Sequence, residues 1–289
     1  MAKESKKLTL NEALQEASFF LQQADWRPDL ARQYWMDLFD QDLTGLVKQL
    51  HQPLTQAQYD RYFEALERLV AGEPIQYIAG FAYFMDAKYR VSPACLIPRE
   101  ETQGLVERAL ANIPIDQVIT VVDMGTGSGI IAIEIKKARP HARVIGVDLS
   151  PEALVIAREN ARFHGVEVEW LQSDFFKDLA TDLLINVFVS NPPYIDQAEL
   201  KLMDPWVLEH EPHLALFAEE QGLASYQVMS AYLPQYLHPS GAAFFEIGYS
   251  QGKMVKSIFQ TAFPHAKVLV DQDYLGKDRY VSVLMTQEE

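Results

Sequence analysis

The sequence of 289 residues predicts an α/β fold in which a mostly parallel sheet carries helices on both faces, preceded by a small N-terminal helical bundle and a bridging β-hairpin. Helix-capping patterns and apolar residues at helical spacing occur throughout roughly the first eighty residues. After residue 117, short apolar runs alternate with helical segments. Strands that alternate with helices typically build a parallel sheet covered on both faces. We therefore expect a helical domain over residues 1–84 and a sheet domain over 85–289, with 85–98 as the bridging hairpin.

Two helix starts support the N-terminal bundle. Thr9 and Glu12 have the spacing of a capping box, in which two side chains satisfy backbone amides at a helix N-terminus. Thr55 and Gln58 repeat the pattern, and apolar residues at helical spacing follow both pairs. Aromatic residues within 80–91 then alternate with other residues and predict the strand pair of the hairpin.

The sheet domain is predicted from its short apolar runs. The expected strands are 118–122, 144–147, 166–171, 185–189, 242–247, 268–270 and 280–284, and helices are expected over 130–138 and 151–163. Proline near the start of the second of these helices is typical of a helix N-terminus.

Composition limits the classes of function. Hydrophobic residues make up 48% and charged residues 22%, as in a globular protein, and no apolar run is long enough to span a membrane. The first ten residues lack the apolar core of a secretory signal, and the single cysteine, Cys95, forms no internal disulfide. We expect a cytoplasmic, monomeric protein. Its net charge of −15 argues against direct binding to nucleic acid.

A glycine-rich loop suggests a nucleotide-like cofactor. Residues 125–129, Gly-Thr-Gly-Ser-Gly, follow an expected strand and open a helix, and Asp123 comes just before them. Asp148 ends the next expected strand, where a carboxylate can accept hydrogen bonds from the hydroxyls of a ribose. The spacing G-x-G-x-G differs from the pyrophosphate-binding G-x-G-x-x-G, and suits S-adenosylmethionine, which has no phosphate. A nicotinamide enzyme and a purely structural turn remain alternatives for the loop alone.

Further groups could surround such a cofactor. Asp123 would suit its ammonium group, directly or through water. Asp174 could accept from an adenine amino group, and the ring of Phe175 could lie beside the adenine. A loop or helix-capping role for Asp174 is the alternative.

The corner Asn191-Pro192-Pro193-Tyr194 directly follows the expected strand 185–189. Two prolines fix the backbone and remove two amide donors, at the strand end where open α/β sheets bind ligands. The side-chain oxygen of Asn191 and the carbonyl of Pro192 can together accept both N–H bonds of a planar amide or amine, and Tyr194 can stack on it. Methyl transfer to a planar nitrogen would then be accelerated by positioning and electrostatics.

With these residues in view, the sequence resembles the release factor glutamine methyltransferases over nearly its whole length, the first seventy residues only in character. The resemblance is carried by the glycine loop and by residues 72–80, 96–102, 191–194, 211–216, 246–248 and 273–276. Phe175 stands where the family often has tryptophan, and Glu100 where it usually has proline.

The resemblance implies a Rossmann-like class I methyltransferase sheet, S-adenosyl-L-methionine as cofactor, and class 1 peptide chain release factors as protein substrate. The methyl group would go to N5 of the glutamine in their Gly-Gly-Gln loop, and the N-terminal domain would dock the release factor. The expected cofactor-binding residues are Asp123, Gly125, Thr126, Gly127, Ser128, Gly129, Asp148, Asp174, Phe175 and Asn191. The expected substrate-binding residues are Asn191, Pro192, Pro193 and Tyr194, with Asn191, Pro192 and Tyr194 as the catalytic ones.

Three alternatives remain for the whole chain. A DNA adenine-N6 methyltransferase can use the same corner, but should carry a basic recognition region that this acidic chain does not show. A glutamine methyltransferase acting on a ribosomal protein is the second alternative. A non-catalytic module with the cofactor fold is the third, although it would not require the intact corner.

A histidine pair and a long connection are two further features of the sequence. His210 and His213 resemble metal ligands, but Pro212 interrupts the helix that would bring them to one face, and no metal is expected. The long connection 195–222 is either a lid, which Trp206 could anchor over the site, or a packed surface excursion.

Overall fold

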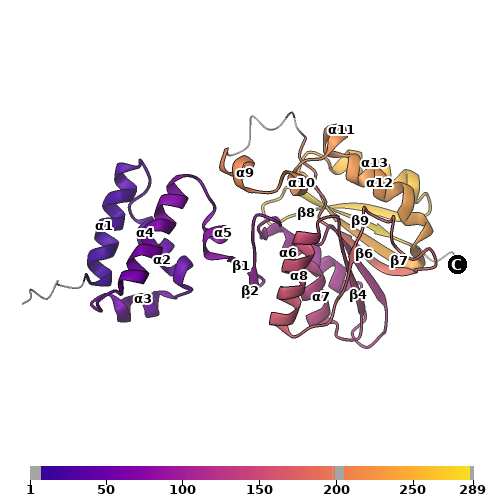
Figure 1. The fold of residues 1–289 in the computed structure, drawn as a ribbon. Helices are drawn as coiled ribbons and strands as arrows, with labels where there is room; N and C mark the ends of the chain where they lie inside the picture. The colour runs from indigo at the N-terminus through magenta and orange to yellow at the C-terminus, as the bar shows by residue number, and fades with distance from the viewer. Residues whose placement is uncertain (1–7, 197, 199–204, 287–289) are drawn as a thin grey trace, which may run out of the picture. The chain divides into compact units, whose positions relative to one another are not determined.

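The computed structural model describes residues 8–196, 198 and 205–286, with the side chains of 205–207 excepted. Its chain divides into two compact units, one formed by Met1–Phe81 with Pro205–His210, the other by Ala82–Asp204 with Glu211–Glu289. Figure 1 labels most of their helices and strands. In its described part, no helix is long and apolar enough to cross a membrane.

The first unit is helical, as the sequence predicts. It contains α1 (Leu10–Gln23), α2 (Leu30–Phe39), α3 (Leu43–Gln49), α4 (Gln56–Val70) and α5 (Ile75–Ala79). Both predicted capping boxes form, at Thr9 before α1 and at Thr55 before α4. The core of the unit is built around the fully buried rings of Trp35 and Tyr62, which meet edge to face.

The hairpin consists of β1 (Phe81–Phe84) and β2 (Ala87–Arg90), so its first strand precedes the predicted range 85–98. Met85 and Asp86 form the turn, both with positive φ. Two successive positive φ angles match the right-handed twist of a two-residue hairpin. The strand pair predicted within 80–91 is therefore present, although neither turn residue is the glycine or asparagine that usually occupies such a turn.

The second unit holds a seven-stranded sheet in the order β5-β4-β3-β6-β7-β9-β8, in which only β9 runs antiparallel to its neighbours. Its strands are β3 (Thr120–Met124), β4 (Arg143–Asp148), β5 (Glu169–Gln172), β6 (Ile185–Ser190), β7 (Leu237–Glu246), β8 (Lys267–Gln272) and β9 (Asp278–Leu284). All seven predicted strands are present. β7 starts earlier than predicted, because it includes the polar segment 238–240. The pairing between β6 and β7 has an irregularity in its register next to this segment.

Helices cover both faces of the sheet (Figure 1). One face packs against α6 (Glu101–Ala111), α7 (Ile130–Ala138) and α8 (Pro151–His164), the other against α12 (Ala224–Tyr232) and α13 (Gly252–Ala262). Shorter helices are α9 (Pro205–His210), α10 (His213–Leu216), α11 (Glu219–Gly222) and the 3₁₀ turn η2 (Leu233–Gln235). The predicted α/β architecture is therefore confirmed.

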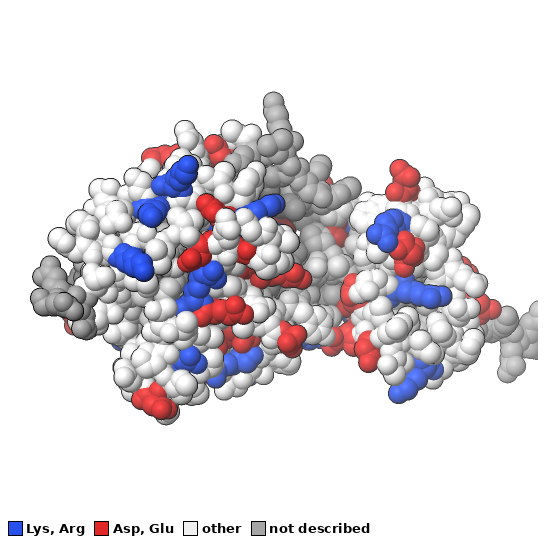
Figure 2. Space-filling model, turned by 180° about the vertical axis from the view of Figure 1, so that it is seen from behind, with Lys and Arg blue, Asp and Glu red and all other residues white. Residues whose placement is uncertain are grey.

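The ends of four parallel strands fix the location of the site. Met124 of β3 lies opposite both Val147 of β4 and Ser190 of β6, and Ser190 in turn lies opposite Phe245 of β7. The glycine loop, Asp148, the Asn191 corner and Glu246 therefore leave the sheet at one edge. On the face drawn in Figure 2, acidic and basic side chains are interspersed, with no continuous basic area among the residues that are coloured.

Candidate active site

A cavity of about 610 Å³ opens at the carboxyl edge of the parallel strands, entirely within the second unit. Its wall is drawn from residues in 94–102, 124–131, 148–153, 173–175, 190–193 and 212–228. The segments that the sequence assigned to cofactor and substrate thus surround one space. Open α/β sheets bind ligands at this edge.

The glycine loop reaches the cavity because its glycines adopt left-handed backbone angles. Gly125, Gly127 and Gly129 have φ of +74°, +56° and +84°. The amides of Gly125 and Thr126 both donate to the carbonyl of Val147 at 2.9 Å, which ties the loop to β4. Gly129 lies behind the cavity wall, where an added Cβ would approach the ring of Trp170 to 2.9 Å. The loop therefore needs glycine both for its turn and for close packing.

Asp148 lines the cavity and is held by backbone amides. Its Oδ2 accepts from the N–H of Gly127 at 2.7 Å, and its Oδ1 accepts from the N–H of Ser150 at 2.9 Å. Burial raises the pKa of this carboxyl, although the backbone amides partly offset that effect. Asp148 is thus fixed between the glycine loop and the start of α8, as a carboxylate contacting a ribose would need to be.

Asp123 lies behind the glycine loop and does not line the cavity. Its Oδ2 accepts from the hydroxyl of Thr126 at 2.5 Å and from the N–H of Ala132 at 3.2 Å. Its Oδ1 is buried and accepts no hydrogen bond from the described residues. Burial raises its pKa to about 7. Asp123 thus braces the loop against α7, and its predicted contact with the cofactor ammonium, directly or through water, stays a prediction.

The adenine-side residues enter the wall from the turn after β5. Ser173, Asp174 and Phe175 all line the cavity. Phe175 has a φ of +49°, an uncommon angle for a bulky residue that turns the chain sharply at this point. Strain of this kind concentrates at functional sites.

The Asn191 corner presents two unoccupied acceptors. The Nδ2 of Asn191 donates to the Oγ1 of Thr102 at 3.1 Å. Among the described residues, nothing donates to the Oδ1 of Asn191 or to the carbonyl of Pro192, and Asn191, Pro192 and Pro193 all line the cavity. Two oxygen acceptors side by side in the chain can receive the two N–H bonds of one planar nitrogen.

Tyr194 differs from the three residues before it in that it is not part of the cavity wall. Its ring packs against Gly248, where an added Cβ would lie 3.4 Å from Cδ2, and burial raises its pKa. Its carbonyl accepts from the Nε2 of Gln251 at 2.8 Å, and the Oε1 of Gln251 accepts from the N–H of Gly248 at 2.9 Å. Gln251 thus ties the corner to the end of β7, a role that no sequence pattern indicated.

Gly222 gives a prediction about this corner. It has a φ of +77°, and an added Cβ would lie 2.1 Å from the carbonyl oxygen of Tyr194. We expect Gly222→Ala to lower the free energy of unfolding by about 1–3 kcal/mol and to reduce methyl transfer, because the corner must shift. Urea unfolding and turnover measure both. Gly165→Ala is the matched control, since Gly165 has a φ of +66° with open space around it. Equal losses in the two variants would contradict the predicted contact with Tyr194.

Glu246 and Thr102 form a buried polar pair beside the corner. Each is only 1% exposed, and the Oγ1 of Thr102 donates to the Oε2 of Glu246 at 2.8 Å. Burial raises the pKa of Glu246 to about 7, while hydrogen bonds from Thr102 and Asn191 and the charge of Arg279 lower it. Both residues lie in segments that carry the family resemblance, but neither was predicted to have a role.

The raised pKa of Glu246 predicts a dependence of stability on pH. A carboxyl whose pKa rises from 4.5 to about 7 on folding stabilises the protein while it is neutral, and that contribution is lost as the pH rises through 7. Glu246→Gln should therefore gain stability relative to the wild type, by up to about 3 kcal/mol, between pH 5 and pH 8. Urea unfolding of both proteins at several pH values checks this. A difference that stays constant with pH would contradict it.

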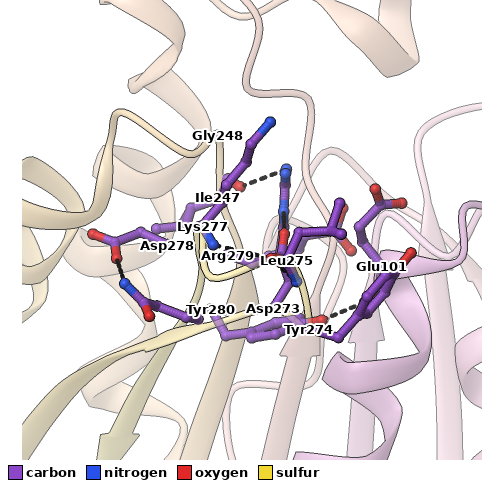
Figure 3. A network of polar contacts seen from close by, with 12 residues as sticks. Glu101, Ile247, Gly248, Asp273, Tyr274, Leu275, Lys277, Asp278, Arg279 and Tyr280 are labelled. Atoms are coloured by element: carbon purple, nitrogen blue, oxygen red, sulfur yellow. Dashed lines mark hydrogen bonds and ion pairs between the residues drawn. The ribbon is translucent and has the colours of Figure 1, made fainter.

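The turn between β8 and β9 supports the same edge (Figure 3). The Oδ1 of Asp273 accepts from the amides of Leu275 at 2.9 Å and Lys277 at 3.0 Å. Arg279 donates to the Oδ2 of Asp273 and to the carbonyl of Ile247, each at 3.3 Å. The turn is thus joined to the segment that follows β7, and it places the positive charge of Arg279 near Glu246.

Within the segment 210–213, Glu211 is held in place by an ion pair with Arg99. Its Oε1 lies 2.5 Å from the Nη2 of Arg99, and it is only 4% exposed, so the pair joins two parts of the cavity wall. In the described part of the chain, no group of three or more His, Cys, Asp or Glu side chains could hold a metal ion.

The connection 195–222 contributes to the site. Ile195 forms an isolated parallel bridge with Phe217, and residues 214, 215 and 217–219 line the cavity. The described part of this segment therefore closes one side of the cavity. The side chain of Trp206, considered above as an anchor, lies outside the described residues.

The parallel sheet, the G-x-G-x-G loop beside an acidic strand end, and the Asn-Pro-Pro-Tyr corner on the same cavity define an S-adenosylmethionine-dependent methyltransferase. Comparisons with known proteins agree with this class of enzyme. Residues 12–80 match the PrmC N-terminal domain and residues 104–214 match the Methyltransferase small domain. A methyltransferase structure from Pyrococcus furiosus shares the fold, with a TM-score of 0.52 and 12% identity over 80% of this chain and 98% of that one.

Two curated relatives cover almost the whole chain. The release factor glutamine methyltransferase of Staphylococcus aureus is 39% identical over 94% of this chain and 97% of its own. That of Lactococcus lactis is 42% identical over 86% of this chain and 91% of its own. The chain therefore belongs to the release factor glutamine methyltransferase family, and the resemblance stated from sequence is confirmed.

Proposed function

We propose that this enzyme transfers a methyl group from S-adenosyl-L-methionine to the side-chain amide nitrogen, N5, of the glutamine in the Gly-Gly-Gln loop of class 1 peptide chain release factors. The observation that carries the proposal is the pair of unoccupied acceptors, Asn191 Oδ1 and the Pro192 carbonyl, at the cavity wall. An amide NH₂ group offers two donors from one nitrogen and matches that pair.

The residues of the corner bind and orient the amide. An amide nitrogen is a poor nucleophile because its lone pair is delocalised into the carbonyl. When Asn191 and Pro192 accept both of its N–H bonds, they can hold the nitrogen with its lone pair directed at the methyl carbon and stabilise the positive charge that develops on it. Pro193 stiffens the corner, and Tyr194, whose carbonyl is held by Gln251, supports it and would stack on the amide in the substrate complex. One proton of the nitrogen leaves to solvent.

The other wall of the cavity fits the cofactor, whose positively charged sulfur makes the bound methyl group electrophilic. Gly125, Thr126, Gly127 and Ser128 bring backbone close to it, and Asp148 accepts from the ribose hydroxyls. Asp174 and Phe175 bind the adenine. Asp123 and Gly129 act through the loop, because neither lines the cavity.

The N-terminal helical domain, residues 1–84, would dock the release factor, and the sheet domain, 85–289, would carry the chemistry. We propose a monomeric, cytoplasmic enzyme that binds no nucleic acid directly. The net charge of −15 and the interspersed charges of Figure 2 support this over a DNA adenine-N6 methyltransferase, which must hold a phosphate backbone.

Transfer of labelled methyl groups tests the substrate. The enzyme is incubated with labelled S-adenosylmethionine and, in separate reactions, a class 1 release factor, intact ribosomal subunits and adenine-containing duplex DNA. We expect label in the release factor alone. Label in a ribosomal protein would favour the sister activity, and label in DNA would overturn the assignment of an amide substrate.

A further inference from the structure

Three elements meet at a buried chain of hydrogen bonds that ends at Asn191. Thr102 lies in the first turn of α6, Glu246 ends β7, and Asn191 follows β6. The Oγ1 of Thr102 lies 3.1 Å from the Nδ2 of Asn191 and 2.8 Å from the Oε2 of Glu246. Asn191 also contributes a hydrogen bond to the carboxyl of Glu246, and the backbone carbonyl of Glu246 accepts from the hydroxyl of Tyr226 at 2.7 Å. These hydrogen bonds thus connect the buried core to the wall of the cavity.

The hydrogen-bond donors and acceptors of these three side chains have only one consistent arrangement while Glu246 is ionised. A carboxylate only accepts, so the single hydroxyl proton of Thr102 must point to Glu246. The hydroxyl oxygen can then only accept from Asn191, which requires the NH₂ end of its amide. The opposite end of the amide, Oδ1, is consequently the one left for the cavity. Without such a partner, the two ends of an asparagine amide are nearly equal in size and shape, and either could face a ligand.

We propose that Thr102 and Glu246 are positioning residues that fix the amide of Asn191 with its oxygen toward the substrate, so that the site accepts a nitrogen carrying N–H donors and rejects an acceptor in its place. This rests on the proposed function. A flipped Asn191 would set an NH₂ group against the NH₂ group of glutamine, where two donors repel. It would attract a carboxylate such as glutamate instead.

Thr102→Val tests the proposal, because valine keeps the shape of threonine and removes the hydroxyl. We expect kcat with a class 1 release factor to fall about tenfold, the equivalent of one oriented hydrogen bond. The dissociation constant for S-adenosylhomocysteine, measured by calorimetry, should stay within about twofold of the wild type. Thr102→Ser keeps the hydroxyl and should restore kcat.

A second readout separates positioning from a general structural role. Binding is compared between the release factor and its variant with glutamate in place of the loop glutamine. The wild type should bind the glutamine form more tightly, and Thr102→Val should lose that preference. Glu246→Gln provides a second variant if Thr102→Val does not fold. Its amide can donate to Thr102, which removes the constraint, so the preference should weaken there too.

The outcomes are distinct. If the wild type transfers methyl groups to the glutamine while Thr102→Val keeps both its kcat and its preference, the positioning role is wrong and the proposed function stands. The role is also wrong if Thr102→Ser is as impaired as Thr102→Val, or if affinity for S-adenosylhomocysteine falls in parallel with kcat. If the wild type itself fails to methylate the release factor, both proposals fall together.

Discussion

Asn191→Ala is expected to lower kcat for the release factor by about 100- to 1000-fold, the effect typical of removing one preorganised polar group that stabilises a transition state. The variant loses the oxygen that we assign to one N–H of the glutamine. It should still fold, because Asn191 lines the cavity and its side chain is hydrogen-bonded only to Thr102 and Glu246 among the described residues. Single-turnover transfer at saturating cofactor measures the chemical step directly.

Asn112→Ala is a matched control for this prediction. Asn112 is exposed, directly follows the last residue of α6 and is absent from the cavity wall, so its loss should leave turnover unchanged. Thermal unfolding of both variants shows whether they remain folded. Near wild-type turnover in a folded Asn191→Ala protein would remove Asn191 from the catalytic role.

Asp148→Ala is expected to raise the dissociation constant for S-adenosylmethionine about 10- to 100-fold. Hydrogen bonds to a charged group contribute about 1.5–3 kcal/mol, and each 1.4 kcal/mol changes the constant tenfold. The variant also frees the amides of Gly127 and Ser150, which loosens the glycine loop. Calorimetric titration of the protein with cofactor measures the effect.

Asp148→Asn keeps the size of the side chain and one carbonyl oxygen, so it should lie between the wild type and Asp148→Ala in cofactor affinity. At saturating cofactor, kcat of the asparagine variant should recover most of the wild-type value, because the corner at Asn191 is intact. Unchanged affinity in Asp148→Ala would show that the carboxylate does not contact the cofactor.

The strands along the chain and the position of the candidate site could be predicted because they depend on local patterns, whereas no order of the strands within the sheet was predicted. The capping boxes at Thr9 and Thr55 need only residues three apart, and apolar runs mark the buried strands. Parallel strands also share one carboxyl edge, so Asp148 and Asn191 could be placed together before any coordinates were known.

Other features depend on tertiary packing that one sequence does not show. Asp123 and Tyr194 occupy the expected segments, but neither is part of the cavity wall. Thr102 and Glu246 are 144 residues apart in the chain and meet only when α6 packs beside β7. Gln251 likewise joins Tyr194 to Gly248 through contacts that carry no local signal.

The measurement that tests the central claim most directly is the location of the transferred methyl group. A class 1 release factor is methylated by the wild type, digested and sequenced by tandem mass spectrometry, with Asn191→Ala as a parallel reaction. We predict one methyl group, on the side-chain nitrogen of the Gly-Gly-Gln glutamine, with little or none from the variant. A methyl group on another residue, or equal labelling by both proteins, would contradict the account.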